Sequence, residues 1–251
     1  MSRIKEPKEL APAVSYYVLQ KGKRIRPLFL IATTEVLGGD LEDSITVGCV
    51  VEMIHNYSLI HDDLPAMDND DYRRGLPSCH KKFGEAIAIL AGDALLTYAF
   101  EIMSDISLYK SLKAEDLLKI SKVLALKSGA EGIVGGQALD ICGSGDLERV
   151  NLKKTASLFE ACFMCAGIIS RREDILSDLE SVGRLVGLLF QITDDILDRN
   201  GYWSVLGTEK ALEKAQALYR ELLHKLKNTF ENTESLVYLT NLVYRRIKED
   251  T

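Results

Sequence analysis

Proline is confined to the first third of this chain, where it occurs as Pro7, Pro12, Pro27, Pro65 and Pro77. Proline lacks a backbone donor and clashes with the preceding turn, so it interrupts helix interiors. After Pro77 the sequence repeats apolar residues at spacings of three and four, and it shows no sustained strand-like alternation. The chain is therefore predicted to be all-α, with long helices after Pro77.

The chain is predicted to form a single domain, residues 1–251. Hydrophobic residues make up 47% of it, which is enough to bury one substantial core. Short polar or glycine-rich segments give candidate helix breaks at residues 38–40, 69–77, 143–146 and 200–201. None of these breaks is long enough to be a linker between domains.

The charge balance limits the possible partners. A net charge of -6 and a pI near 5.4 argue against a general nucleic-acid binder and an anionic-membrane binder, because both need a dense basic surface. No apolar run approaches the roughly 18 residues of a membrane-spanning helix, and the first residues do not resemble a secretion signal. We therefore expect a cytoplasmic protein with no membrane span and no nucleic-acid partner.

The cysteines do not form a disulfide framework. Their number, five, is odd and they are scattered along the chain, which is typical of a reducing compartment. Cys162 and Cys165 form a C-x-x-C pair, but there is no second pair to complete a zinc site. Because the surrounding sequence is apolar with helical spacing, both are predicted to be core thiols.

Two clusters of aspartates form the candidate chemical site. Their members are Asp62, Asp63 and Asp68 in the first cluster, and Asp194, Asp195 and Asp198 in the second. At about 100° per residue, Asp194 and Asp198 differ by roughly 40° around a helix, and Gln191 differs from Asp198 by roughly 20°. Apolar residues flank this polar stripe, so it is predicted to line an interior cavity.

Clustered carboxylates need a counter-charge. Two like charges about 4 Å apart cost about 4 kcal/mol at an effective dielectric constant of about 20. Oxygen ligands favour Mg²⁺, which commonly bridges protein carboxylates to substrate phosphates. In the alternative interpretation, the first cluster is a solvated turn and the second caps a helix. That alternative explains one cluster better than it explains two clusters that are both embedded in apolar sequence.

His55 belongs to an E-x-x-H element that begins at Glu52. This element occurs in di-iron helical bundles, but such sites use two copies and the chain has no second one. His55 lies seven residues before Asp62 and thus on nearly the same helical face. This placement favours a substrate contact beside the metal ions.

Basic residues lie on both sides of the first cluster. Lys23, Arg24 and Arg26 precede it, and Arg73 and Arg74 follow it. Guanidinium groups bind phosphate through paired hydrogen bonds. Together with the acidic clusters, these residues indicate a polyanionic ligand.

Several motifs occur together in one order. They include Gly22-Lys-Arg-Ile-Arg-Pro27, Leu59-Ile-His-Asp-Asp-Leu-Pro-Ala-Met-Asp68, Arg73-Arg-Gly75, Leu90-Ala-Gly-Asp-Ala-Leu-Leu96, Gly135-Gly-Gln-Ala-Leu-Asp140 and Phe190-Gln-Ile-Thr-Asp-Asp-Ile-Leu-Asp198. From Gly22 to about Gly207 the sequence resembles the trans-isoprenyl diphosphate synthases of the polyprenyl synthetase family, and most closely the bacterial farnesyl diphosphate synthases. The resemblance implies the isoprenoid synthase fold, a bundle of roughly ten or more helices around a deep central cavity, usually paired as a homodimer.

The resemblance also implies a reaction. Isopentenyl diphosphate would be joined head-to-tail to an allylic diphosphate, either dimethylallyl or geranyl diphosphate. The allylic C–O bond would ionise, the alkene would attack, and a proton would be lost. About three Mg²⁺ ions would be bound together with the substrates. Asp62, Asp68 and Asp194 would hold the ions, supported by Asp63, Asp195 and Asp198.

The same resemblance implies the substrate contacts. Arg73 and Lys154 would contact the allylic diphosphate. Thr155 and Gln191 would face the reacting carbons. The residues that would bind the diphosphate of isopentenyl diphosphate are Lys23, Arg26, His55 and Arg74.

Tyr57 and Ser58 are the predicted chain-length residues, because they occupy the fifth and fourth positions before Asp62. In the resembling family, an aromatic residue followed by serine at these positions goes with a fifteen-carbon product, farnesyl diphosphate. Geranyl and geranylgeranyl diphosphate are the alternative products. In another interpretation, Tyr57 is an ordinary core residue.

The sequence also departs from the family pattern. The segment after Asp198 reaches a charged helix at about Thr208 without the lysine-bearing loop that the family usually has, so the lysine that replaces this lid contact is not assigned. A non-catalytic partner subunit therefore stays an alternative. A terpene cyclase is a further alternative, but it would not need the second diphosphate site formed by Lys23, Arg26 and His55.

Overall fold

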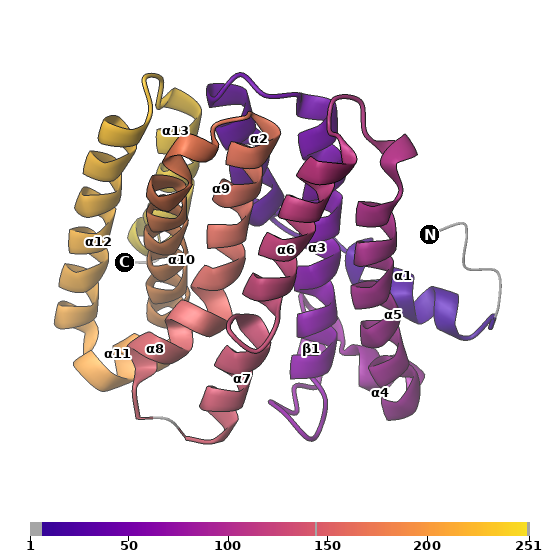
Figure 1. Ribbon diagram of the computed structural model, residues 1–251. Helices are drawn as coiled ribbons and strands as arrows, with labels where there is room; N and C mark the ends of the chain where they lie inside the picture. The colour runs from indigo at the N-terminus through magenta and orange to yellow at the C-terminus, as the bar shows by residue number, and fades with distance from the viewer. Residues whose placement is uncertain (1–6, 144, 250–251) are drawn as a thin grey trace. The chain divides into compact units, whose positions relative to one another are not determined.

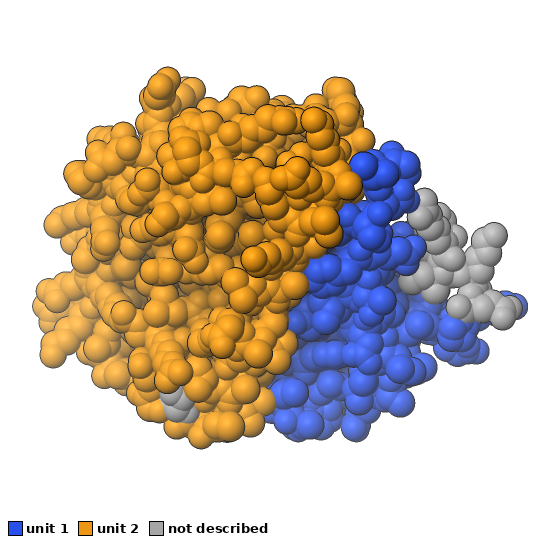
Figure 2. Space-filling model, viewed as in Figure 1, with its two compact units in different colours: residues 1–24, 49–108 blue, residues 25–48, 109–251 orange. Residues whose placement is uncertain are grey.

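The computed structural model describes residues 7–143 and 145–249, and helices dominate it (Figure 1). The predicted all-α class is therefore confirmed. The chain separates into two compact units, coloured differently in Figure 2. Unit 1 comprises residues 1–24 and 49–108, and unit 2 comprises residues 25–48 and 109–251. The single domain stays a prediction.

Unit 1 is a small group of helices with one short hairpin. Helices α1, α4 and α5 pack against one another, and the last part of α3 belongs to the same unit. The elements are α1 (Leu10–Val18), α3 (Leu41–Asp62), β1 (Tyr72–Arg73), β2 (Leu76–Pro77), α4 (Cys79–Phe83), α5 (Glu85–Ser104) and the 3₁₀ helix η1 (Ile106–Leu108).

The hairpin of β1 and β2 contains the only strands among the described residues. The strands are antiparallel, with Arg73 opposite Leu76. Between them, Arg74 has φ 55° and Gly75 has φ 77°, and positive φ at both central residues is typical of a type I′ turn. Glycine adopts this conformation easily, whereas a side chain makes it cost about 1–2 kcal/mol. The turn therefore holds two arginines of the candidate site in fixed positions.

Helix α5 is long and apolar enough to cross a membrane by length and composition alone. The sequence was expected to contain no apolar stretch as long as a membrane-spanning helix. That expectation was wrong for α5. One such helix is weak evidence, because core helices of soluble proteins pass the same test. About a third of its most apolar stretch is buried, and we infer no membrane span from it.

Unit 2 is built around α9, in which every residue except Met164 is buried. A helix that is buried on all sides needs neighbours on all sides. Helices α2, α6 and α10 pack against it, and α10 packs in turn on α12 and α13, which lie beside it in Figure 1. The elements are α2 (Ile25–Val36), α6 (Ala114–Ser128), α7 (Ile133–Ile141), α8 (Leu147–Asn151), the π-helix η2 (Leu152–Ala156), α9 (Ser157–Ile169), the 3₁₀ helix η3 (Glu173–Ile175), α10 (Leu176–Asp198), α11 (Gly201–Leu206), α12 (Thr208–Thr229) and α13 (Glu234–Glu249).

Aromatic rings fill the contact between α2 and α9. The ring centroid of Phe29 lies 5.7 Å from that of Phe163 and 6.2 Å from that of Phe159. Cys162 and Cys165 lie on the same helix as buried thiols, which confirms their prediction as core residues. These side chains hold α9 in place. Two of the predicted site residues lie on η2, which directly precedes α9.

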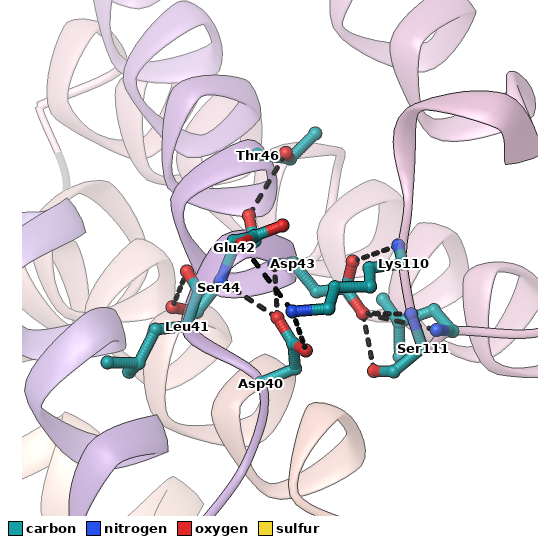
Figure 3. Close-up of polar contacts among 9 residues, drawn as sticks. Asp40, Leu41, Glu42, Asp43, Ser44, Thr46, Lys110 and Ser111 are labelled. Carbon is teal, nitrogen blue, oxygen red and sulfur yellow. Dashed lines mark hydrogen bonds and ion pairs between the residues drawn. The ribbon is translucent and has the colours of Figure 1, made fainter.

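Asp43, in the first turn of α3, is a buried anchor for the segment before α6 (Figure 3). Its carboxylate accepts backbone N–H bonds from Lys110 at 2.7 Å, Ser111 at 2.9 Å and Leu112 at 3.1 Å. The hydroxyl of Ser111 donates to it as well, at 2.5 Å. Burial raises the pKa of Asp43, but the hydrogen bonds outweigh burial, so the pKa is lowered overall. The ionised carboxylate therefore holds the chain that enters α6.

Asp43→Asn should lower the free energy of unfolding by about 3 kcal/mol at pH 7. The NH₂ group of the asparagine would replace one carboxylate oxygen, and it cannot accept the hydrogen bonds that the backbone N–H groups donate. The lowered pKa adds a pH dependence. The stabilisation is present above the unfolded-state pKa of about 3.9 and is lost as the pH falls through the folded-state value. Urea unfolding at pH 7 to 3 should therefore show that wild type and variant converge below about pH 4.

Glu42→Gln is the matched control for this variant. Glu42 is an exposed neighbour whose carboxylate lies 3.4 Å from the Lys110 Nζ. Its loss should change the free energy of unfolding by less than about 1 kcal/mol. Equal destabilisation by the two variants would contradict the anchoring role of Asp43.

Candidate active site

The first aspartate motif lies in unit 1, where α3 ends. The chain turns back after the helix, so that the Asp68 N–H donates to the Asp62 carbonyl at 2.9 Å and the Asn69 N–H donates to the Leu64 carbonyl at 3.1 Å. Asp62 is half-buried and Asp68 is exposed. The turn thus brings two predicted metal ligands into one loop and leaves both at least partly exposed.

Asp63 has a different environment, because it is fully buried. Its Oδ1 accepts a hydrogen bond from the Arg73 Nε at 2.9 Å, and its Oδ2 accepts one from the Tyr17 hydroxyl. Arg73 also donates to Asp70 at 2.7 Å. Burial disfavours the charge on Arg73, but the two carboxylates outweigh burial and raise the pKa of Arg73. Asp63 therefore fixes Arg73, and protein donors engage both of its oxygens.

Arg24 and Arg74 form a second basic group in unit 1, beside Glu52. The Arg24 Nη2 donates to the Val18 carbonyl at 2.7 Å, and its Nη1 lies 3.2 Å from the Glu52 carboxylate. Gly22 permits this packing, because a Cβ there would lie 2.1 Å from the Arg24 Nη1 and 3.3 Å from the Arg74 guanidinium. Arg24 therefore holds the end of α1 and contributes positive charge beside Arg74.

The other predicted ligands of isopentenyl diphosphate are divided between the units. Lys23 is exposed and His55 is half-buried, and both belong to unit 1. Arg26 belongs to unit 2 and is buried, with its guanidinium carbon 4.6 Å from the Phe159 ring centroid and 5.5 Å from that of Phe190. These aromatic faces hold the cation in place.

The second aspartate motif lies near the C-terminal end of α10, in unit 2. Asp195 is buried and accepts hydrogen bonds from the Gln191 Nε2 at 2.7 Å and the Tyr202 N–H at 2.8 Å. The Gln191 Oε1 in turn accepts one from the Thr155 hydroxyl at 2.6 Å. Burial raises the pKa of Asp195, and the two hydrogen bonds offset part of that effect. A hydrogen-bonded chain therefore connects Thr155 through Gln191 to Asp195.

Asp194 and Asp198 are more accessible than Asp195. Asp194 forms an ion pair with Arg246 of α13. The guanidinium carbon of Arg246 also lies 5.3 Å from the Phe190 ring centroid. Each motif thus contains one buried aspartate bound by protein donors, together with aspartates that are more exposed.

The π-helix η2 carries Lys154 and the predicted catalytic threonine. The Lys154 Nζ donates to Asp140 of α7 at 2.7 Å. Two glycines allow neighbouring helices to approach η2 closely. A Cβ on Gly136 would lie 2.2 Å from the Lys154 nitrogen, and a Cβ on Gly187 would lie 2.4 Å from the Ala156 Cα. Such π-turns are frequent at functional sites.

The predicted chain-length residues lie on α3. Tyr57 is buried, and its ring meets that of His61 edge-on at a centroid distance of 5.9 Å. Burial raises the pKa of Tyr57 to about 12, so the phenol is neutral at pH 7. The Ser58 hydroxyl donates to the His55 carbonyl at 2.9 Å. Tyr57 is therefore a buried, neutral ring just over one turn before Asp62.

Within residues 7–143 and 145–249, no group of three or more His, Cys, Asp or Glu side chains is arranged to hold a metal ion. The accessible oxygens of Asp62 and Asp68 in unit 1, and separately those of Asp198 in unit 2, are nevertheless of the kind that suits a hard divalent cation. Asp194 already binds a positive charge, that of Arg246. The donors therefore fit Mg²⁺ if diphosphate oxygens complete its coordination.

Comparison with known proteins agrees with these motifs. A family model described as polyprenyl synthetase matches residues 7–212. The chain belongs to the polyprenyl synthetase family. A farnesyl diphosphate synthase from Micrococcus luteus is 48% identical over 205 residues, which cover 79% of this chain and 69% of the relative. A geranylgeranyl pyrophosphate synthase from Catharanthus roseus is 38% identical over 271 residues, which cover 97% and 75% of the two chains.

A solved structure shares the fold of this polyprenyl synthetase. The apo structure of an FPP/GFPP synthase from Zymomonas mobilis is 38% identical and superposes with a TM-score of 0.87. The match covers 94% of this chain and 88% of the other. The family resemblance and the isoprenoid synthase fold inferred from the motifs are thereby confirmed.

Two residues of the site, Tyr17 and Arg246, received no role from the sequence, and Arg24 was counted only as one member of the basic group. Arg24 lies inside the basic motif, but only the structure separates it from its neighbours, by its contact with Glu52. Tyr17 lies 46 residues from its aspartate partner, and Arg246 lies 52 residues from its own. No local sequence pattern predicts either of these two pairings.

Gly187→Ala should lower the free energy of unfolding by about 1–3 kcal/mol, because the new Cβ would force α10 away from η2. Gly145→Ala is the matched control, since a Cβ there meets nothing within 4 Å. Its effect should stay within about 0.5 kcal/mol. Urea unfolding of both variants measures the difference, and a neutral Gly187→Ala would contradict the close approach.

Proposed function

We propose that the protein is a short-chain trans-prenyltransferase. It condenses isopentenyl diphosphate head-to-tail with dimethylallyl and geranyl diphosphate, and farnesyl diphosphate is its main product. The main structural support for this proposal is a contrast within each aspartate motif. Asp63 or Asp195 is buried against protein donors, and the neighbouring carboxylates are more exposed. Family membership and the likeness to a relative named farnesyl diphosphate synthase support this reaction class.

The metal ligands in this proposal come from both motifs. When bound, about three Mg²⁺ ions neutralise the diphosphate leaving group and favour ionisation of the allylic C–O bond. Asp63 and Asp195 act through the groups that they orient, because protein donors engage their oxygens. The direct ligands are Asp62, Asp68 and Asp194, supported by Asp198.

Fixed cations bind the two diphosphates. Arg73 and Lys154 hold the allylic diphosphate, and carboxylate partners 2.9 Å and 2.7 Å away keep both side chains ordered. A preorganised cation loses less conformational entropy when a phosphate binds. The diphosphate of isopentenyl diphosphate is bound by Lys23, Arg26, His55 and Arg74.

Thr155 and Gln191 face the carbons that react. The Thr155 hydroxyl donates its proton to the Gln191 Oε1, so the lone pairs of its oxygen are available to a nearby positive charge. Such dipoles stabilise an allylic cation without trapping it. The alkene of isopentenyl diphosphate then forms the new C–C bond, and the released diphosphate accepts the proton.

The proposal includes a cytoplasmic homodimer with no nucleic-acid partner. The net charge of -6 supports the last point. The homodimer rests on the family resemblance. A non-catalytic partner subunit is the competing function, and an activity assay separates the two.

The purified protein should form farnesyl diphosphate from labelled isopentenyl diphosphate and dimethylallyl diphosphate in the presence of Mg²⁺. Asp62→Asn and Asp194→Asn should each reduce turnover by at least about a hundredfold, because each removes a charged ligand from the leaving-group site. Circular dichroism should show that both variants keep the helical fold, because Asp62 and Asp194 are only partly buried and the amide keeps the size and shape of the side chain.

Asp71→Asn is the control, because this exposed residue pairs with Lys81 at 2.7 Å and has no place in the proposed site. Its turnover should stay within about twofold of wild type, as expected when a surface ion pair is lost. Near-normal turnover in Asp62→Asn or Asp194→Asn would remove the metal role. A wild-type protein that forms no product would support the partner-subunit function instead.

Tyr57→Ala should release products longer than fifteen carbons, because it removes a buried ring just over one turn before the metal ligands. Ser58→Phe should shorten the products by filling the same space. Tyr57→Phe keeps the ring and should keep the wild-type distribution. Chromatography of the dephosphorylated products measures chain length, and an unchanged distribution in both test variants would place the chain-length wall elsewhere.

A further inference from the structure

Tyr17 of α1 has no part in the reaction as described so far. It is fully buried, yet its hydroxyl has two polar partners. The backbone N–H of Cys79 donates to the hydroxyl oxygen at 3.0 Å, and the hydroxyl donates to the Asp63 Oδ2. Because the oxygen accepts on one side, its single hydrogen is directed to Asp63.

This contact determines how the Asp63 carboxylate is oriented. Tyr17 holds Oδ2, while Oδ1 accepts from both the Nε and the Nη2 of Arg73. The carboxylate cannot rotate about its terminal bond without losing a hydrogen bond to one partner or the other. The plane of the Arg73 guanidinium follows from this orientation, and Asp70 holds the same Nη2 at 2.7 Å.

Arg73 is the member of this group that can meet a ligand. Its side chain is 28% exposed, whereas that of Asp63 is 0% exposed. The Tyr17 side chain is also buried, so its hydroxyl reaches a bound diphosphate through Asp63 and Arg73, whereas the backbone carbonyl of Tyr17 accepts a hydrogen bond from Arg74 that Tyr17→Phe leaves in place. The order of contacts is therefore Tyr17, Asp63, Arg73 and ligand.

The adjacent Tyr16 provides a natural contrast on the same helix. Its hydroxyl donates to the Pro77 carbonyl at 3.0 Å in an exposed setting. Both tyrosines thus connect α1 to the segment where β2 ends and α4 begins. Of the two hydroxyls, that of Tyr17 bonds to an aspartate of the first motif, and that of Tyr16 bonds to a backbone carbonyl.

We propose that Tyr17 is a positioning residue for the allylic diphosphate, acting through Asp63 on Arg73. The inference rests on the proposed function, in which Arg73 contacts that diphosphate. Loss of the Tyr17 hydroxyl releases one oxygen of Asp63, so Arg73 samples orientations that no longer suit the ligand. Binding of isopentenyl diphosphate, which uses other side chains, is not affected.

Tyr17→Phe tests this role, because it removes the hydroxyl and keeps the ring. The KM for dimethylallyl diphosphate should rise about tenfold, as expected for loss of a hydrogen bond to a charged group. In Tyr17→Phe the KM for isopentenyl diphosphate should change by less than about twofold. In the control Tyr16→Phe, the KM values for both substrates should change by less than about twofold. Arg73→Ala should also raise the KM for dimethylallyl diphosphate, by at least as much as Tyr17→Phe does.

Asp63→Asn alone provides a second test, and this single variant does not depend on how Tyr17→Phe folds. It should raise the KM for dimethylallyl diphosphate selectively. Adding Tyr17→Phe to Asp63→Asn should change that KM by less than about twofold, because Tyr17 acts through the carboxylate that has already been replaced. The thermal unfolding midpoint of each variant shows whether the fold is retained.

The outcomes separate this inference from the function on which it rests. If the wild type is active, two results would overturn the positioning role alone. One is an equal rise of both KM values in Tyr17→Phe, and the other is the same effect in Tyr16→Phe. Full additivity in the double variant would also overturn it. A wild type without prenyltransferase activity would overturn the proposed function and this inference with it.

Discussion

Buried carboxylates that are bound by fixed protein donors are the interaction on which this structure depends. Removing an ionised carboxylate from water costs several kcal/mol unless hydrogen bonds or a paired charge compensate it. Asp43, Asp63 and Asp195 are each at most 3% exposed. Each of them binds donors from a different segment of its own unit. Each therefore joins two segments by an interaction that few alternative packings could satisfy.

Both aspartate motifs use this interaction to support their accessible neighbours. Consecutive residues on a helix differ by about 100° in direction, so one of two adjacent aspartates can face inward while the other stays accessible. Asp195 faces Gln191 and Tyr202, and the adjacent Asp194 stays partly exposed. A carboxylate that we propose as a metal ligand has little freedom to move beside a buried and fully bound neighbour, and preorganised charges of this kind bind transition states well.

The helices could be predicted from the sequence because apolar spacing and proline position act locally. The residue types of the site could be predicted for the same reason, since like charges close together require a cation. Spacing did not separate Asp62 from Asp63, because burial of Asp63 depends on Tyr17, which lies 46 residues earlier. The hairpin at Arg74 escaped prediction because its left-handed turn lacks the usual Asn-Gly signal and begins with an arginine.

Two arginines of the candidate site adopt the left-handed conformation, and the need to place their charge accounts for it. Arg24 and Arg74 have φ 49° and 55°, where a side chain costs about 1–2 kcal/mol relative to the right-handed region. Glycine would remove this cost, but it would also remove the guanidinium groups beside Glu52. Arg24 uses its group to bond the Val18 carbonyl and to pair with Glu52, and contacts of this kind offset the backbone cost. The local strain is therefore explained by the charge that the site requires, and the fold alone would be better served by glycine.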